Sequence, residues 1–453
     1  MRLRKKMAEG LREVGRVLVE REYNRIEPER LEDCPLRLRV AGQEYRRRPK
    51  SRNTIGTWFG EIELRRYLYE ATEPGERALF PLERQLGIEA GLATPALAER
   101  VGLWSVDHEQ EPVRTMLLED HGVTWSVKSL RKVTAALRNG MASFREETQL
   151  AKVLELLEKA ERSKGKHRPV LAAGRDGIHV PIRDQGYHEG ATATVSVMDR
   201  RGKRLGTVYL GQMPESGQET LSVQLTSLLT KILAIWHARG HAAPRLAYVT
   251  DGGFHPKDYY QRVLRRMADP WRVGQRLAWE WIVDFWHACG YLHKLAEGLF
   301  GDGDKAWGWF RKWRHWLRDR HQGLAQVLRS AMWHYNNSRK LTKAGAELFW
   351  TAYRYLRKHA VWMKYTTYRS RGMPIGSGVT EAACKTVFAE RLKRSGMTWS
   401  CVGGQVILDL RVLVLSRVWN QAHQSYLASQ GLPTVVKPAS DGIRRARTLK
   451  KAA

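Results

Sequence analysis

Three acidic residues that are far apart in the sequence fall where strand and helix ends would bring their carboxylates together. Asp176 lies within a predicted strand, Asp251 ends a second strand, and Glu381 opens a helix. Phosphodiester cleavage gains from two divalent cations held about 3.5–4 Å apart, which activate the nucleophile and stabilise the leaving oxygen. Mg²⁺ prefers carboxylate oxygens and keeps several waters, so three acids suffice to hold it. The three acids therefore predict a catalytic site with two Mg²⁺ ions, for which Mn²⁺ can substitute.

Each of these acids also has an ordinary structural interpretation. An Asp-Gly pair after a strand, as at Asp251, is most often a turn, and Glu381 suits the first turn of a helix because of the helix dipole. Three further acids are interpreted as turn or surface residues: Asp184, Asp199 and Asp258. The catalytic interpretation depends on the three acids taken jointly, in a chain that is otherwise strongly cationic.

A second pair, Asp284 and His287, lies at the end of another predicted strand, three residues apart. The ordinary interpretation is a helix-capping aspartate and a satisfied core histidine. The functional alternative places both residues beside the metal site, where they would position DNA or a flipped base. No set of histidines and cysteines in the sequence has the spacing of a zinc site.

The composition points to a nucleic-acid partner. The chain of 453 residues has 77 Lys and Arg against 47 Asp and Glu, a formal net charge of +30, and 43% hydrophobic residues. Such a charge in a globular protein indicates a polyanionic partner. No apolar run approaches the roughly 20 residues of a membrane helix, and the four cysteines form no CxxC pair, which fits a reducing cytosol. We expect a cytoplasmic, nucleoid-associated protein with DNA as partner and no membrane contact.

The first 160 residues predict a smaller, mostly helical DNA-binding region in two parts. Residues 1–90 are basic, with a helical pattern in the first fifty and a short β-hairpin within 54–69. Residues 91–162 predict helices at 95–101, 112–119, 126–137 and 144–162. The third follows a glycine-containing turn, as in a helix-turn-helix, and its basic residues are Lys128, Arg131 and Lys132. An ordinary three-helix bundle has the same spacing, so both interpretations stay open.

After a linker at 163–166, strands and helices alternate. The predicted strands are 169–182 (interrupted at Gly174 to Gly177), 191–198, 205–210, 245–250 and 279–285, and the predicted helices are 219–239, 257–267 and 287–299. Three strands, a helix, a strand, a helix and a strand are the chain order of an RNase H-like mixed sheet. The predicted fold class is α/β, with the catalytic domain built from residues 166–300 and 372–425.

Residues 301–371 separate these two parts and predict a large all-helical insertion that is rich in tryptophan. From 305 to 371 there are sixteen Lys and Arg but only two acids. Burial in a helical core explains most of the tryptophans, but it does not explain this charge ratio. We expect one face of the insertion to lie on DNA phosphates, where some rings could stack on unpaired bases. The basic tail at 426–453 is expected to be disordered.

One run near the C-terminus resembles the C-terminal signature of the Kra-type DDE transposases, a bacterial insertion-sequence family distantly related to Mutator-like elements. The matching residues are Pro374-Ile375-Gly376-Ser377-Gly378-Val379-Thr380-Glu381-Ala382-Ala383-Cys384-Lys385, then Arg391 to Trp399, and Gly403-Gly404-Gln405. Three fragments fall in matching order: Arg175-Asp176-Gly177, Thr250-Asp251-Gly252 and Asp284-Phe285-Trp286-His287. The resemblance covers roughly residues 165–425 and is specific at its C-terminal end.

The resemblance implies that Asp176, Asp251 and Glu381 are a catalytic triad that binds two Mg²⁺ ions. It also implies that Asp284 and His287 are the acid-x-x-His motif that such transposases carry near the second aspartate. Four basic residues follow Glu381 and are placed to contact phosphates, with a solvated basic face as the alternative: Lys385, Arg391, Lys393 and Arg394. The first 160 residues match less well, and they lack the paired cysteines of a zinc ribbon.

The activity implied by the resemblance is that of a DNA transposase. Such an enzyme cleaves a strand at each transposon end and joins the freed 3′-hydroxyl to target DNA, which requires a dimer or a larger homo-oligomer to hold two ends. Two alternatives stay open: a structure-selective nuclease of the same fold, and a domesticated transposase that acts only as a DNA-binding regulator. Joining of 3′ ends to a second duplex separates the transposase from the nuclease, and the intact triad speaks against the regulator.

Overall fold

The computed structural model of the chain describes residues 2–28, 34–40, 42–73, 75, 77–337, 341–430 and 437–438. The chain divides into two compact units. Unit 1 comprises Met1–Phe144 and Gln421–Ala453, and unit 2 comprises Arg145–Asn420. None of the helices in the described ranges is both long enough and apolar enough to cross a bilayer.

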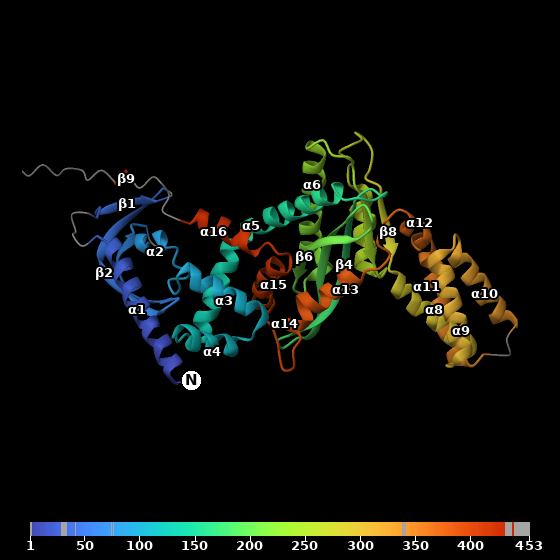
Figure 1. The fold of residues 1–453 in the computed structure, drawn as a ribbon, viewed down its shortest axis with the longest axis horizontal. Coiled ribbons are helices and arrows are strands. Elements are labelled where there is room, and N and C mark those ends of the chain that lie inside the picture. The colour runs from blue at the N-terminus through green and yellow to red at the C-terminus, as the bar shows by residue number, and fades with distance from the viewer. Residues whose placement is uncertain are drawn as a thin grey trace, which may run out of the picture. The chain divides into compact units, whose positions relative to one another are not determined.

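Unit 1 combines a small antiparallel sheet with several helices (Figure 1). The sheet has the order β3-β2-β1-β9, with strands β1 (Arg37–Val40), β2 (Gln43–Thr57), β3 (Gly60–Ala71) and β9 (Lys437–Pro438). The helices are α1 (Arg2–Ile26), α2 (Pro81–Gln85), α3 (Pro95–Asp107), α4 (Gln110–His121), the first part of α5 (Val127–Glu161) and most of α16 (Trp419–Ser429). Helix α1 is tied to β3 because Asn24 Nδ2 donates to Glu63 O at 2.8 Å.

The predicted β-hairpin is confirmed, with longer strands than expected, since β2 and β3 pair from Tyr45 to Thr57. The helix predicted over the first fifty residues is correct only as far as Ile26. The arginine-rich stretch after residue 43 forms β2, where charged side chains are stabilised by partners across the strands rather than along a helix. Arg48 pairs with Glu70, and Arg52 pairs with Glu63 at 3.4 Å.

The three helices predicted after residue 94 are present as α3, α4 and the start of α5. They share a buried core of Ala93, Leu97, Ala98, Val101, Val113, Leu117, Val123, Trp125, Leu130 and Val133. The predicted separation between 126–137 and 144–162 is wrong, because α5 is one continuous helix of 35 residues. Gly140 lies inside it, where a β-carbon would overlap the ring of Tyr426 from the same unit.

Unit 2 contains a mixed sheet of five strands in the order β6-β5-β4-β7-β8. The strands are β4 (Val170–Ile182), β5 (Gly186–Met198), β6 (Arg204–Gln212), β7 (Arg245–Thr250) and β8 (Trp279–Val283). Strands β4, β5 and β6 pair antiparallel, while β7 is parallel to β4 and β8 is parallel to β7. Strand β4 is not interrupted at Gly174 to Gly177 as predicted, because every residue from Val170 to Ile182 pairs with β5.

Helices cover both faces of this sheet (Figure 1). Helix α6 (Glu219–Ala238) and the end of α5 pack on one face through a core that includes Leu156, Val195, Leu229 and Tyr248. Helices α7 (Phe254–Arg262) and α8 (Phe285–Phe300) follow β7 and β8. The C-terminal helices α13 (Gly378–Ala383), α14 (Glu390–Leu392) and α15 (Cys401–Leu415) pack on the ends of β4 and β6, opposite α6. The observed class is thus α/β with a mixed sheet.

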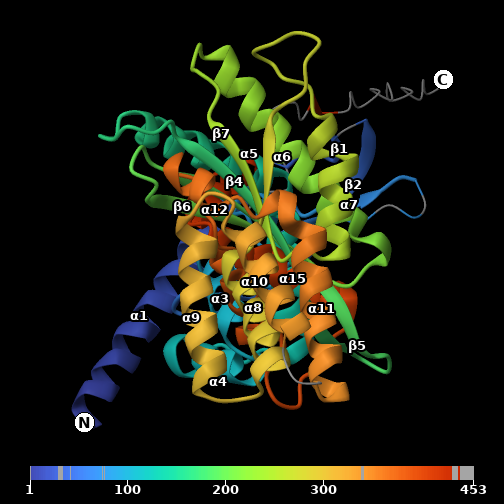
Figure 2. The ribbon, with the colours of Figure 1, turned by 90° about the vertical axis from the view of Figure 1, so that its right-hand side faces the viewer.

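The predicted helical insertion is confirmed for its described residues. Its helices are α9 (Asp304–Asp319), α10 (Gly323–Asn337), α11 (Lys343–His359) and α12 (Tyr365–Ser370), and residues 338–340 lie outside the described part of the chain. Helices α8, α9, α10 and α11 run side by side as a bundle (Figure 2). Trp309 and Trp313 are buried in its core, whereas Trp307 and Trp333 are 45% and 61% exposed. The prediction of a disordered tail from residue 426 is wrong for its described part, because residues 426–429 belong to α16 and Lys437–Pro438 form β9, while residues 431–436 and 439–453 lie outside the described part of the chain.

Candidate active site

Asp176 and Asp251 are neighbours because of the parallel register of β4 and β7. Ala173 pairs with Tyr248, and three more residues along each strand lead to Asp176 and Asp251. Side chains alternate across a strand, so both carboxylates lie on the face of the sheet opposite α6. The strand pairing therefore brings these two acids to neighbouring positions on one face of the sheet.

Glu381 is brought to the same face by helix α13. Its neighbour Thr380 is buried, and Thr380 Oγ1 lies 2.8 Å from Thr194 Oγ1 on β5. Gly174 makes this close packing possible, because a β-carbon there would overlap Thr380 Oγ1. The helix then continues through a π-helical turn, Cys384–Ala389, a deviation that is frequent at functional sites. Helix α13 thus places the third acid beside β4 although Glu381 is far away in the sequence.

The pKa of the Asp176 carboxyl responds to the charges of the other two acids. Burial raises the pKa of Asp176 to about 6, repulsion from Asp251 and Glu381 adds to this effect, and hydrogen bonds from Cys384 and the Gly177 N–H oppose it. Burial also raises the pKa of the Cys384 thiol, as does the charge of Asp176, so the thiol stays protonated and can donate. A cluster of mutually repelling carboxylates of this kind is stabilised by a cation.

One oxygen of each acid is held by a neighbouring donor. Asp176 Oδ1 accepts from Gly177 N, Asp251 Oδ1 from Gly253 N, and Glu381 Oε1 from Ser377 Oγ, each at 2.8 Å. As the side chains stand, no three His, Cys, Asp or Glu residues in the described ranges are arranged to hold one metal ion. The donor set nevertheless fits Mg²⁺, which prefers carboxylate oxygens and keeps waters in its remaining positions.

The helical insertion contacts the Asp251 segment directly. Tyr355 of α11 donates its hydroxyl to Asp251 O at 2.6 Å, and its ring stacks on Tyr291 of α8 with centroids 3.7 Å apart. His359, one turn further along α11, lies against Gly252, where a β-carbon would be 3.4 Å from His359 Nε2. Burial lowers the pKa of His359, and the nearby Lys358 and Lys257 lower it further. The insertion therefore supports the site and brings cations close to it.

Asp284 and His287 occupy the start of α8, beside the acids. Asp284 is fully buried, and its Oδ1 accepts from His287 N at 2.6 Å, while Oδ2 accepts from Ser377 N. With both oxygens occupied, Asp284 is not available to touch DNA as predicted, and the capping interpretation describes it correctly. His287 is half-buried, with its ring beside those of Tyr291 and Tyr355.

The four basic residues predicted after Glu381 have different environments. Lys385, Lys393 and Arg394 are exposed, whereas Arg391 is 2% exposed and its guanidinium lies over the ring of Trp399. The buried position of Arg391 gives it a packing role in place of the predicted phosphate contact. In unit 1, the three predicted DNA-binding residues of α5 are all exposed: Lys128, Arg131 and Lys132.

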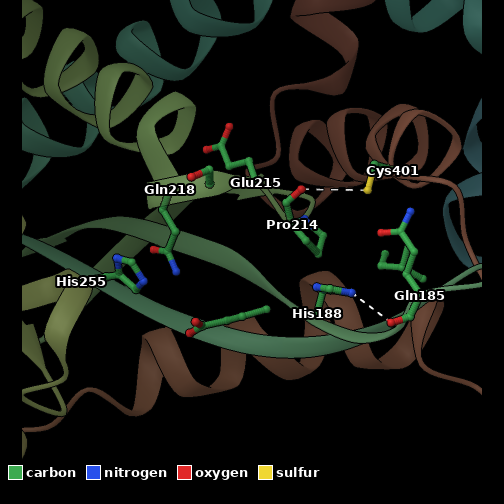
Figure 3. Close-up of a pocket in the computed structure, with 10 residues that line it drawn as sticks. Gln185, His188, Pro214, Glu215, Gln218, His255 and Cys401 are labelled. Atoms are coloured by element: carbon green, nitrogen blue, oxygen red, sulfur yellow. Dashed lines mark hydrogen bonds between the residues drawn. The ribbon is translucent and has the colours of Figure 1, made fainter.

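A polar pocket of about 390 Å³ lies between the start of α6, the end of β4 and the start of α15. It is lined by Ile182, Gln185, His188, Glu189, Pro214, Glu215, Ser216, Gln218, His255 and Cys401 (Figure 3). None of the three acids contributes to its wall. The pocket and the acidic cluster are therefore separate features of unit 2.

The sequence did not single out four residues that build this site: Gly174, Tyr355, Ser377 and Thr380. Ser377 had a local signal, because it immediately precedes α13 and lies four residues before Glu381, a spacing at which two side chains are neighbours. Tyr355 and Gly174 had none, since their partners lie more than one hundred residues away in the sequence. No protein-family model matches the chain, and no curated protein matches it.

Proposed function

We propose that this chain is a DNA transposase of the DDE type, related to the Kra-type insertion-sequence enzymes, with an RNase H-like catalytic domain in unit 2. The observation that carries the proposal is the convergence of Asp176, Asp251 and Glu381 on one face of the sheet, in a chain of net charge +30. A cluster of three acids in so cationic a protein is explained by divalent ions that act on a polyanionic substrate.

The strand order supports the RNase H-like part of the proposal. Three antiparallel strands are followed by two parallel ones, in the spatial order β6-β5-β4-β7-β8, with β4 at the centre. Asp176 is on the central strand and Asp251 follows its parallel neighbour. The helical segment 301–371 enters between Asp251 and Glu381, as the resemblance implies.

In this proposal the three carboxylates bind two Mg²⁺ ions, which Mn²⁺ can replace. Such ions supply activation of the attacking oxygen and neutralisation of charge on the phosphate. The chain's own residues hold the carboxylates in place: Gly253 N orients Asp251, and Ser377 Oγ orients Glu381. Catalysis then comes from positioning and charge neutralisation rather than from a protein nucleophile.

The insertion is the proposed DNA-binding surface of unit 2. Its exposed basic residues are Lys305, Arg311, Lys312, Arg320, Arg329, Lys343, Arg354, Arg357, Lys358, Lys364 and Arg369. Two of them, Arg357 and Lys358, lie on α11 within one turn of Tyr355, which contacts Asp251. A duplex whose phosphates bind along α11 would extend towards the three acids. The exposed rings of Trp307 and Trp333 could stack on unpaired bases.

The test is Mg²⁺-dependent cleavage of labelled duplexes taken from the DNA that flanks this gene in its host. Asp251→Asn and Glu381→Gln should bind these duplexes as the wild type does but should not cleave them. Glu347→Gln, an exposed acid on α11, is the control and should cleave normally. Cleavage that survives in Asp251→Asn or Glu381→Gln would contradict the triad, and binding without any cleavage would favour the regulator.

A further inference from the structure

Asp284 is buried in a position that connects the segments of two proposed catalytic acids. It has no solvent exposure, and its carboxylate accepts from His287 N and Ser377 N. Its own backbone N–H donates to Thr250 O at 2.7 Å, next to Asp251. Asp284 therefore contacts the end of β7, the start of α8 and the loop that leads into α13.

The loop that leads into α13 is fixed by these contacts. Phe285 N donates to Ile375 O at 2.9 Å, next to the hydrogen bond that Ser377 N donates to Asp284. A β-carbon at Gly376 would lie 3.3 Å from Trp286 Cδ1, so this loop packs closely on the start of α8. Asp284 thus holds Ser377 at a defined place relative to Asp251.

Ser377 in turn makes hydrogen bonds that fix the position of Glu381. Ser377 is 4% exposed, and its carbonyl accepts from Thr380 N at 2.6 Å and from Glu381 N at 3.0 Å. Its hydroxyl donates to Glu381 Oε1 at 2.8 Å. The Glu381 side chain is exposed, and an exposed glutamate without such a bond samples many rotamers.

We propose that Asp284 and Ser377 are positioning residues for Glu381. Asp284 fixes the Ser377 backbone, and the Ser377 hydroxyl holds the Glu381 carboxylate in one conformation beside β4. This inference rests on the proposed function, because it assigns to Asp284 a role in the same catalytic site. Asp284 acts through Ser377 and does not touch DNA.

Ser377→Ala is the most selective test, because it removes the hydroxyl and keeps the backbone bond to Asp284. Hydrogen bonds to charged groups are strong enough that loss of one corresponds to about a 10-fold effect. We expect about 10-fold weaker Mn²⁺ binding in the absence of DNA, measured by titration of the free-Mn²⁺ resonance signal. We also expect kcat for cleavage to fall about 10-fold, with KM and the melting temperature unchanged.

Two further variants separate positioning from general structure. Ser377→Thr retains the hydroxyl and should restore Mn²⁺ binding and kcat. Ser370→Ala removes an exposed hydroxyl that bonds only to Thr367 O among the described contacts, and it should behave as the wild type. Asp284→Asn replaces one acceptor by a donor that faces an N–H group, so it should lower kcat together with the melting temperature.

The outcomes distinguish this inference from the proposed function. Cleavage that depends on Glu381 but is unchanged in Ser377→Ala, with unchanged Mn²⁺ binding, would overturn the positioning role alone. Cleavage that does not depend on Glu381 would overturn the proposed function and this inference with it. A 10-fold loss in Ser377→Ala that Ser377→Thr restores would establish the positioning role.

Discussion

Replacing Asp176 by asparagine should stabilise the metal-free protein at neutral pH. The Asp176 carboxylate is partly buried near two other acids, and this raises its pKa from 3.8 to about 6. A carboxyl group whose pKa is higher in the folded state binds a proton more tightly there than in the unfolded chain. Stability therefore falls as the pH rises from about 4 to about 6, and the full cost remains above pH 6.

The size of the effect follows from this pKa. A pKa raised from 3.8 to about 6 corresponds to about 3 kcal/mol at most. Asparagine has nearly the same shape but does not ionise, so Asp176→Asn lacks this pH-dependent cost. For a unit of this size, about 3 kcal/mol corresponds to an increase of roughly 5–10 °C in melting temperature.

The assay is thermal unfolding of wild type and Asp176→Asn in EDTA, at constant ionic strength, from pH 4 to pH 7.5. The difference in melting temperature should be small at pH 4, should grow up to pH 6 and should then stay constant. Asp302→Asn, at an exposed aspartate in the loop between α8 and α9, makes the same chemical change away from the acids and is the control. Saturating Mg²⁺ should raise the melting temperature of the wild type but not that of Asp176→Asn.

A difference between Asp176→Asn and wild type that does not vary with pH would refute this reasoning. So would an Asp176→Asn protein that is less stable than the wild type at pH 7 in EDTA. Either result would mean that the Asp176 carboxylate is not strained by burial and by its acidic neighbours.

Three further predictions concern the residues around the acids. Gly174→Ala should displace helix α13, lowering stability by about 1–3 kcal/mol and abolishing cleavage, and normal cleavage would contradict the proposed fit. Tyr355→Phe should cost about 1 kcal/mol of stability and lower kcat without changing DNA affinity, because it releases Asp251 O; an unchanged kcat would count against that link. Arg357→Ala with Lys358→Ala should make the slope of log K against log salt shallower by about 1.8, and an unchanged slope would remove α11 from the DNA interface.

Much of unit 2 could be predicted from local sequence patterns. The strand predicted at 245–250 is β7 as observed, and the predicted helix at 219–239 matches α6 to within one residue. These elements are buried and have strong apolar patterns, so local preference and tertiary packing agree. The nearness of Asp176 and Asp251 has a simple basis, because Asp176 lies within β4 and Asp251 directly follows its parallel neighbour β7.

The remaining features depend on long-range contacts that a local pattern does not contain. Gly174 does not interrupt β4 and instead makes room for Thr380, while Gly140 lies inside α5 against Tyr426. Glycine is typical of a break in a helix or strand. In both cases, however, the missing side chain lets a distant segment pack closely. Asp284 caps α8 as its ordinary interpretation predicted, but its contact with Ser377, 93 residues away in the sequence, could not be predicted for the same reason.

The measurement that tests the central claim most directly is strand transfer by the purified chain. A duplex carrying a terminal sequence from the flanking DNA, with a free 3′-hydroxyl, is incubated with a supercoiled plasmid and Mg²⁺. We predict covalent joining of the duplex to the plasmid by the wild type, and no joining with a 3′-dideoxy end or with Glu381→Gln. Hydrolysis without joining would identify a nuclease, and joining by Glu381→Gln would contradict the assignment of Glu381.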